Sequence, residues 1–146
     1  MNRRIPLLAL VAALFLTSCT VPSVCDLYNN AQKEIEVELV RRDGNRQTIP
    51  LKPREIQKIK EWDFVRTARI HVLNEKKEIE RVWEYANPPV PEVKHWKWRG
   101  WWIFSRHYFD AQVEPNGVLS ILGKNQTLPI SPDDSVFSIR PTNTER

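Results

Sequence analysis

In the stretch Glu34-Ile35-Glu36-Val37-Glu38-Leu39-Val40, charged and apolar side chains alternate from Glu34 to Leu39. Successive side chains of a β-strand point to opposite faces, so this period of two predicts a half-buried antiparallel strand. Its apolar face enters the core, and its three glutamates stand in a row along the strand. Because side chains in such a row do not converge, we expect a solvated face here and not a cation site.

Similar short segments lie on both sides of this strand, separated by turn residues. Asp43-Gly44 is a strong hairpin signal, and Pro50 and Pro53 mark a corner. The predicted strands cover residues 24–28, 34–40, 46–51, 66–73, 78–85, 101–114, 118–122 and 135–139. Residues 55–59 form either a further strand or, with the residues up to 62, a helical turn. Eight or nine short strands predict an all-β fold, an antiparallel β-sandwich or, as the alternative, a small β-barrel.

Three local features carry further expectations. In the turn Glu114-Pro115-Asn116-Gly117, Gly117 is free to adopt a positive φ. Cys25, in the first strand, is expected to be a small buried residue, and an intermolecular disulfide is the alternative. The polar residues 142–146 are expected to form a frayed tail.

The N-terminus has the layout of an export signal. Arg3 and Arg4 precede an uncharged segment, residues 5–16. That segment is too short to cross roughly 30 Å of hydrocarbon as a permanent helix. It ends in Leu16-Thr17-Ser18-Cys19, which resembles the lipobox of bacterial lipoprotein signal peptides. The resemblance implies diacylglyceryl transfer to the Cys19 thiol, cleavage before Cys19, and acylation of the new amine.

The same resemblance implies a location and a domain layout. Residues 1–18 are a lipoprotein signal peptide, residues 19–24 the lipidated N-terminus and a short tether, and residues 25–141 a single β-sandwich domain. Thr20 is not the aspartate that in this family favours inner-membrane retention, so the implied location is the outer membrane, facing the periplasm. Loss of residues 1–18 lowers the net charge from +4 to +2. This charge gives no basis for a nucleic-acid partner.

A proline- and tryptophan-rich excursion interrupts the strands at residues 86–102. It contains His95-Trp96-Lys97-Trp98-Arg99-Gly100-Trp101-Trp102, where four of the six tryptophans of the chain interleave with cations. Three interpretations remain open: contact with the membrane interface, binding of an envelope protein or glycan, and packing of the indoles over one end of the sandwich. The candidate contact residues are Trp96, Lys97, Trp98, Arg99 and Trp101.

The rest of the sequence carries no signature of catalysis. The histidines His71, His95 and His107 lack metal-ligand spacing, and there is no serine elbow or phosphate-binding loop. His107 lies on the apolar side of its predicted strand and is expected to be a core histidine. We therefore predict a non-enzymatic binding or scaffolding domain with no catalytic residue, no metal site and no cofactor. The alternative is an envelope hydrolase or metal-dependent enzyme in which His71 or His107 meets a carboxylate.

Overall fold

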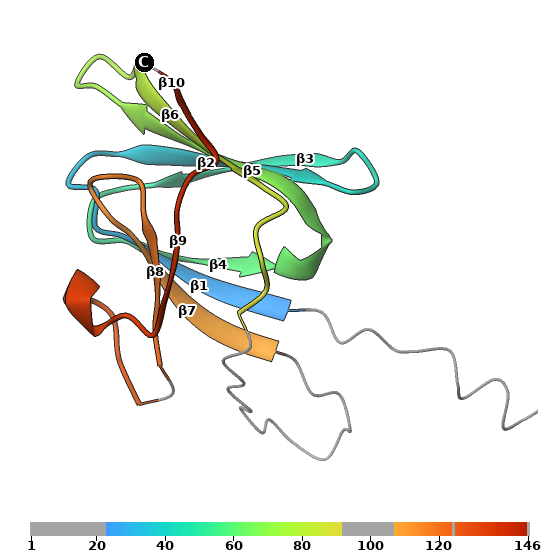
Figure 1. Cartoon of the computed structure of the whole chain (residues 1–146). Helices are drawn as coiled ribbons and strands as arrows, with labels where there is room; N and C mark the ends of the chain where they lie inside the picture. Colours follow the sequence, from blue (N-terminus) through green and yellow to red (C-terminus); the bar gives the residue numbers. More distant parts are fainter. Residues whose placement is uncertain (1–22, 92–106, 124, 146) are drawn as a thin grey trace, which may run out of the picture.

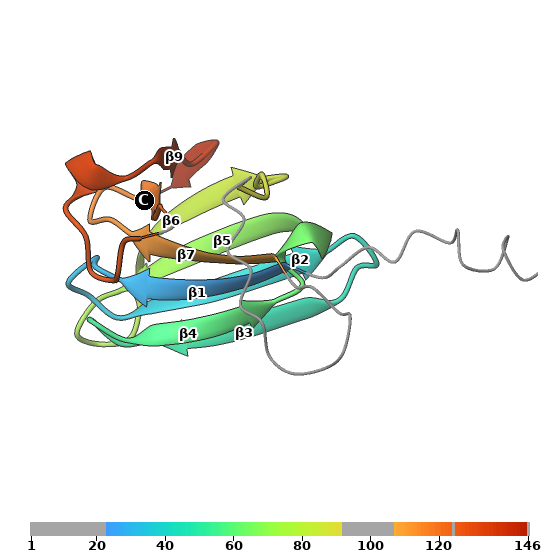
Figure 2. The same ribbon diagram turned by 90° about the horizontal axis from the view of Figure 1, so that it is seen from below.

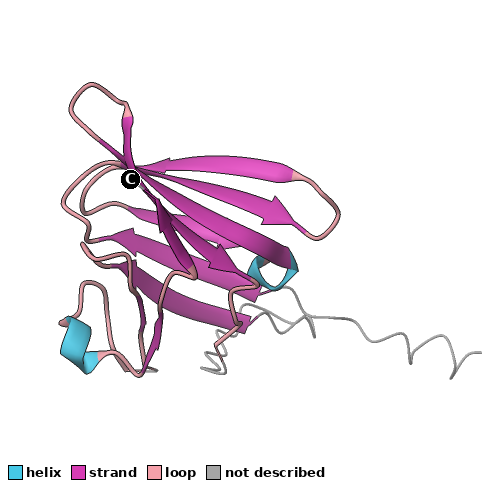
Figure 3. Cartoon of the chain, turned by 45° about the horizontal axis from the view of Figure 1, so that its top comes forward, coloured by secondary structure: helices cyan, strands magenta, loops and turns pink. Residues whose placement is uncertain are grey.

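A computed structural model of the chain describes residues 23–91, 107–123 and 125–145 (Figure 1). These residues form ten β-strands and two 3-10 helices of one turn each, which lie at the margins of the strands (Figure 3). The strands are β1 (Ser23–Asn29), β2 (Ile35–Arg41), β3 (Arg46–Leu51), β4 (Ile56–Lys60), β5 (Val65–Leu73), β6 (Ile79–Ala86), β7 (His107–Val113), β8 (Leu119–Ile121), β9 (Phe137–Ile139) and β10 (Asn143–Glu145). The 3-10 helices are η1 (Trp62–Phe64) and η2 (Pro132–Asp134).

The strands form two five-stranded sheets. The first has the order β4-β1-β7-β8-β9 and the second the order β10-β6-β5-β2-β3. All neighbouring pairs are antiparallel except β1 and β7, which run parallel with Ser23 opposite His107. Figure 2 shows β1 between β4 and β7. Neither sheet closes into a barrel, so the predicted β-sandwich is confirmed and the small-barrel alternative is wrong.

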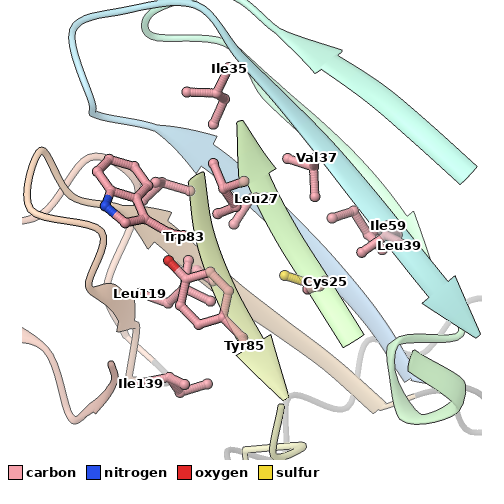
Figure 4. Packing of buried hydrophobic residues seen from close by; sticks show 14 of the residues in the cluster. Cys25, Leu27, Ile35, Val37, Leu39, Ile59, Trp83, Tyr85, Leu119 and Ile139 are labelled. Atoms are coloured by element: carbon pink, nitrogen blue, oxygen red, sulfur yellow. The ribbon is translucent and has the colours of Figure 1, made fainter. Parts of the chain in front are cut away.

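The core lies between the two sheets and follows from the alternation along the strands. Ile35, Val37 and Leu39 of β2 are 0–1% exposed and point at the first sheet (Figure 4). Cys25 of β1 is 0% exposed and has a free thiol, which confirms its prediction as a small buried residue. The ring of Trp62 meets Phe109 edge-on, with 5.8 Å between the ring centroids. Such T-shaped contacts add to the stabilisation from burial.

The turn between β7 and β8 is fixed against the opposite sheet. Gly117 has a φ of +83°, as its place in the turn predicts, and a Cβ there would lie 2.6 Å from the indole of Trp83. The hydroxyl of Tyr85 donates a hydrogen bond to the carbonyl oxygen of Gly117. Trp83 and Tyr85 both belong to β6, and their side chains lie between the sheets (Figure 4). Position 117 therefore requires glycine for two reasons: its φ is positive, and the indole of Trp83 leaves no room for a Cβ.

A buried amide joins the sheets near the same end. Asn29 is 0% exposed. Its Nδ2 donates to the carbonyl oxygens of Lys33 at 2.8 Å and Leu51 at 3.1 Å. Its Oδ1 accepts from the N–H of Ala31 at 2.9 Å. Because burial without partners would be costly, this full set of bonds specifies how β1, β3 and the β1–β2 connection fit together.

Several predicted boundaries differ from the structure. The expectation of a frayed tail is wrong, because β10 pairs with β6. Ser23 and Val24, which the predicted layout assigns to the tether, belong to β1. Of the two alternatives left open for residues 55–62, the strand is present as β4, and a helical turn, η1, begins only at Trp62. Of the predicted strand 101–114, the structure describes β7 from residue 107 onward, and residues 101–106 lie outside the described residues.

Candidate functional site

The residues predicted to make contacts or to carry lipid lie outside the described residues. They are Cys19, Trp96, Lys97, Trp98, Arg99 and Trp101. The segments that contain them join described strands, since residues 19–22 lead into β1 and residues 92–106 lead into β7. Because β1 and β7 are parallel neighbours, both segments join the fold at one end of the first sheet (Figure 1). We call this end, where β1 and β7 begin, the entry end.

Hydrogen bonds fix the first residue of the fold at the entry end. Asp63 Oδ1 accepts from the N–H of Ser23 at 2.9 Å and from its hydroxyl at 2.7 Å. The N–H of Asp63 donates back to Ser23 Oγ at 2.8 Å. Beside them, Trp62 Nε1 donates to the carbonyl oxygen of Pro89 at 3.3 Å. The chain that leads into β1 is thus held at Ser23, and the segment after β6 is held against η1.

A polar pocket lies on the outer face of the second sheet. Its volume is about 210 Å³ and it is lined by Glu38, Arg69, His71, Val82, Glu84, Asn143 and Glu145. These residues come from β2, β5, β6 and β10, and the register places Arg69 between Glu38 and Glu84. The inward neighbours of these residues, such as Leu39 and Ile70, fill the core. The alternation that builds the core therefore also builds the pocket.

The charges in the pocket are paired with one another. Arg69 Nε donates to Glu84 Oε2 at 2.6 Å, and Arg69 Nη1 lies 3.5 Å from Glu38 Oε2. The hydrogen bond to Glu84 is the main cause that raises the pKa of the Arg69 guanidinium. Arg46 Nη1 lies 3.3 Å from Glu38 Oε1. This network fits the binding of a small polar group through the remaining donors of Arg69.

The two histidines proposed for catalysis lie in different sheets. His71 belongs to β5 and its Nε2 is 3.7 Å from Glu38 Oε2, beyond hydrogen-bonding distance. His107 is the first residue of β7. Its side chain lies outside the described part of the chain, so the core position stays a prediction. None of the pocket-lining residues carries a hydroxyl or a thiol. Within residues 23–91, 107–123 and 125–145, no three His, Cys, Asp or Glu side chains converge as metal ligands would.

The row of glutamates at 34, 36 and 38 does not converge, as expected from the strand geometry. Glu34 pairs with Lys77 from the β5–β6 connection, whereas Glu38 pairs with Arg46 and Arg69. Sequence reasoning placed these glutamates and Arg69 on polar strand faces but did not bring Glu38, Arg69 and Glu84 together. The missing information was the strand register. The alternation shows which face of the sheet a residue takes, but not which residue of the neighbouring strand lies opposite it.

Comparison of the chain with models of known families, with curated proteins and with solved structures finds no match. In the part of the chain that the structure describes, no helix has the length and apolar character to cross a membrane.

Proposed function

We propose that this chain is a lipid-anchored β-sandwich of the cell envelope that binds a protein or glycan partner without catalysing a reaction. A lipid on Cys19 holds it on the outer membrane, facing the periplasm. The supporting sequence feature is the lipobox-like Leu16-Thr17-Ser18-Cys19 behind Arg3, Arg4 and a short apolar segment. Two or more acyl chains give stable attachment, whereas a single chain gives reversible binding.

One structural observation fits this proposal most directly: Ser23, four residues after Cys19, is already fixed in β1 of the sandwich. Ser23 is 1% exposed and is bonded to Asp63 at its N–H and its hydroxyl. Thr20, Val21 and Pro22 are then the whole tether, which reaches about 14 Å from Cys19 to Ser23 when fully extended. A domain on such a tether works at the membrane surface and not across a wide periplasm.

The proposed partner surface is the segment that contains Trp96, Lys97, Trp98, Arg99 and Trp101. It joins the fold at β7, beside the start of β1, so the tether and this segment enter neighbouring strands. Tryptophan and arginine are the residues most often found at the energetic centres of interfaces. Their place next to the tether suits a partner that itself lies at the envelope.

Metabolic labelling with radioactive palmitate tests the lipid anchor. The unmodified chain and the Cys25→Ala variant should both incorporate label and sediment with membranes, whereas Cys19→Ala should do neither. Cys25→Ala is the matched control because it removes the other cysteine of the chain. Equal labelling of the Cys19→Ala variant, or no labelling of any form, would contradict the proposed anchor.

Crosslinking in intact envelopes tests the partner surface. The Trp96→Ala/Trp98→Ala variant should lose crosslinked species that the unmodified chain forms. Phe137→Ala is the control, because Phe137 is an aromatic residue of β9 that is 47% exposed. An unchanged crosslinking pattern in the double tryptophan variant would remove this segment as the partner surface.

A second candidate function, an envelope hydrolase or metal-dependent enzyme, has one observation in its favour. His71 lies in the pocket with its Nε2 3.7 Å from Glu38 Oε2, so a carboxylate that could orient an imidazole base lies nearby, although the two are not hydrogen-bonded. This function predicts turnover of an ester, phosphoester or glycoside that the His71→Gln variant loses and the Lys76→Gln control keeps. Equal turnover by both variants, or none by the unmodified protein, would exclude a catalytic role for His71.

A further inference from the structure

Five exposed side chains lie at the entry end. None of them forms a hydrogen bond or an ion pair with another described side chain. They are Arg42, Lys60, Phe64, Arg66 and Val90, which together we call the entry-end surface. We propose that this surface rests on the anionic phospholipid headgroups of the bilayer that holds the lipid on Cys19. The inference depends on the proposed lipid anchor and deepens it, because it states which face of the sandwich meets the membrane.

Backbone hydrogen bonds hold the entry-end surface together. The N–H of Arg42, in the β2–β3 connection, donates to the carbonyl oxygen of Phe64 at 3.0 Å. The N–H of Asn87 donates to the carbonyl oxygen of Arg66 at 2.7 Å. Lys60 ends β4 opposite Val24 in β1. Three connections that are distant in sequence thus meet around the start of β1, where η1 also lies (Figure 1).

The acidic side chains of this end are occupied by internal contacts. Asp43 accepts from the N–H and the side-chain amide of Asn45, at 3.0 and 2.7 Å. Glu61 is bound by Arg41, and Asp63 by Ser23.

The cations of the surface are placed differently. Arg42, Lys60 and Arg66 form no salt bridge with any residue in the described ranges. Asp43 and Asp63 keep their negative charges, because their partners Asn45 and Ser23 are neutral. Three cations less these two carboxylates leave a net charge of +1 beside the Arg41–Glu61 pair, the sign that a surface meeting lipid phosphates requires.

The opposite end of the sandwich carries both paired and unpaired cations. There Lys33 pairs with Glu80 at 2.5 Å, and Lys77 pairs with Glu34. Lysine and glutamate alternate through the β5–β6 connection, Glu75-Lys76-Lys77-Glu78. An exposed apolar residue, Ile79, lies at this end too, with 55% of its surface exposed. Lys52, Arg54 and Lys76 of this end also form no salt bridge with any described residue. Both ends thus carry unpaired cations and exposed apolar side chains, and what distinguishes the entry end is its position next to the tether.

Phe64 and Val90 give the entry-end surface an apolar contribution. Their side chains are 42% and 39% exposed, and the backbone of Phe64 is hydrogen-bonded to that of Arg42. Aromatic side chains favour the interfacial region of a bilayer, where the ring enters the headgroup layer. Cations around an exposed ring therefore match the two layers of a phospholipid surface, phosphates outside and acyl chains within.

The short tether keeps this surface within reach of the headgroups. With Cys19 in the bilayer, Ser23 lies at most about 14 Å away along the chain. Charges are screened over about 8 Å at physiological ionic strength, so the basic side chains around Ser23 fall within or close to the range of the membrane's field. The lipid anchor also raises the local concentration of the domain at the surface, so a modest attraction is enough for docking.

A nitroxide attached at position 64 tests this orientation in the full lipidated protein. The Phe64→Cys and Ile79→Cys variants are purified and reconstituted into vesicles of phosphatidylethanolamine and phosphatidylglycerol, and into phosphatidylcholine vesicles. The label goes to the new cysteine because the Cys19 thiol carries lipid and Cys25 is buried. We expect the label at 64 to be shielded from a water-soluble paramagnetic agent on the anionic vesicles only, and the label at 79 to stay accessible on both.

A charge variant tests the electrostatic part. Replacing Arg42, Lys60 and Arg66 with glutamine should lower the ratio of docked to undocked domain about 100-fold, since each basic residue contributes roughly five-fold near an anionic surface. The matched control replaces three exposed basic residues of the opposite end, Lys52, Arg54 and Lys76, and should leave the shielding at position 64 unchanged.

The outcomes separate this inference from the proposed anchor. A protein that carries no lipid and does not remain with vesicles refutes the anchor itself. A lipidated, vesicle-bound protein with equal accessibility at positions 64 and 79 leaves the anchor standing and overturns the inference. Equal shielding on anionic and neutral vesicles, or equal losses in the two charge variants, overturns it as well.

Discussion

Gly117 is the position where a single side chain conflicts most directly with the fold. Its φ is +83°, and a Cβ would lie 2.6 Å from the ring of Trp83. Gly44 has a similar φ of +87°, but no atom lies within 4 Å of a Cβ built there. The two glycines therefore separate backbone strain from overpacking.

Replacement of each glycine by alanine should show this difference in urea unfolding. Gly44→Ala should lower the free energy of unfolding by about 1–2 kcal/mol, the cost of a left-handed backbone at an L-residue. Gly117→Ala should cost about 1–3 kcal/mol more, because Trp83 has to move. Equal losses in the two variants would show that Trp83 does not pack on Gly117.

Cys25 and Tyr85 make stability depend on alkaline pH. Burial raises the pKa of the Cys25 thiol well above its ordinary value of 9.0, and the nearby charges of Asp26 and Asp110 add to the shift. Burial also raises the pKa of Tyr85 above its ordinary value of 10.0. In the unfolded chain both groups ionise near these ordinary values, whereas in the folded protein they stay protonated.

The free energy of unfolding should therefore be constant, as far as these groups are concerned, below about pH 9 and should fall above it. Each group contributes a slope of about 1.4 kcal/mol per pH unit once its unfolded form is ionised. Denaturation by urea at a series of pH values measures this slope, and Cys25→Ala should reduce it between about pH 9 and pH 10. The same slope in the Cys25→Ala variant would mean that the thiol is not buried.

At the scale of elements, β10 shows how a polar strand is held. Thr142 precedes it, and its side chain bonds twice to β6, with Oγ1 accepting from the N–H of Ala86 at 3.2 Å and donating to the carbonyl oxygen of Glu84 at 2.9 Å. Its backbone N–H also donates to the carbonyl oxygen of Glu84, at 2.7 Å. Thr142→Val keeps the shape of the side chain but removes both side-chain bonds.

Amide hydrogen exchange at Ala86 should become roughly five-fold faster in Thr142→Val, the effect of losing a hydrogen bond worth about 1 kcal/mol. Thr144→Val is the control, because Thr144 is exposed and its hydroxyl bonds to no described residue. Unchanged exchange at Ala86 would indicate that β10 is not docked on β6.

Sequence patterns predicted the strands that have one buried face. In β2, β5 and β6 the apolar residues alternate, because one side of each strand packs in the core and the other meets solvent. β10 was not predicted, because its residues Asn143, Thr144 and Glu145 are all exposed and pair with β6 only through the backbone. A strand without a buried face leaves no periodic signal.

Strand order and register could not be predicted from the sequence for a different reason. The parallel pairing of β1 with β7 joins segments that are about eighty residues apart, and nothing local records it. The pocket formed by Glu38, Arg69 and Glu84 depends on that kind of information, because each residue alone reads as a solvated charge. The entry-end surface likewise becomes visible once three separate connections are brought together.

At the scale of the whole molecule, the two ends of the sandwich have different roles in the proposed function. At the entry end, where β1 begins (Figure 1), Arg42, Lys60 and Arg66 are exposed and form no salt bridge with any described residue. At the opposite end Lys33 and Lys77 are paired with glutamates, whereas Lys52, Arg54 and Lys76 form no described salt bridge. A sandwich docked by its entry end would present its opposite end, and the pocket on its side, towards the periplasm.

The intact mass of the protein isolated from envelopes tests the lipid anchor most directly. The account predicts a mature chain that begins at Cys19 and carries a diacylglyceryl group on its thiol, with a further acyl chain on the amine. It also predicts that the N-terminal peptide partitions into detergent. A chain that retains residues 1–18, or a released protein with an unmodified Cys19 thiol, would contradict it.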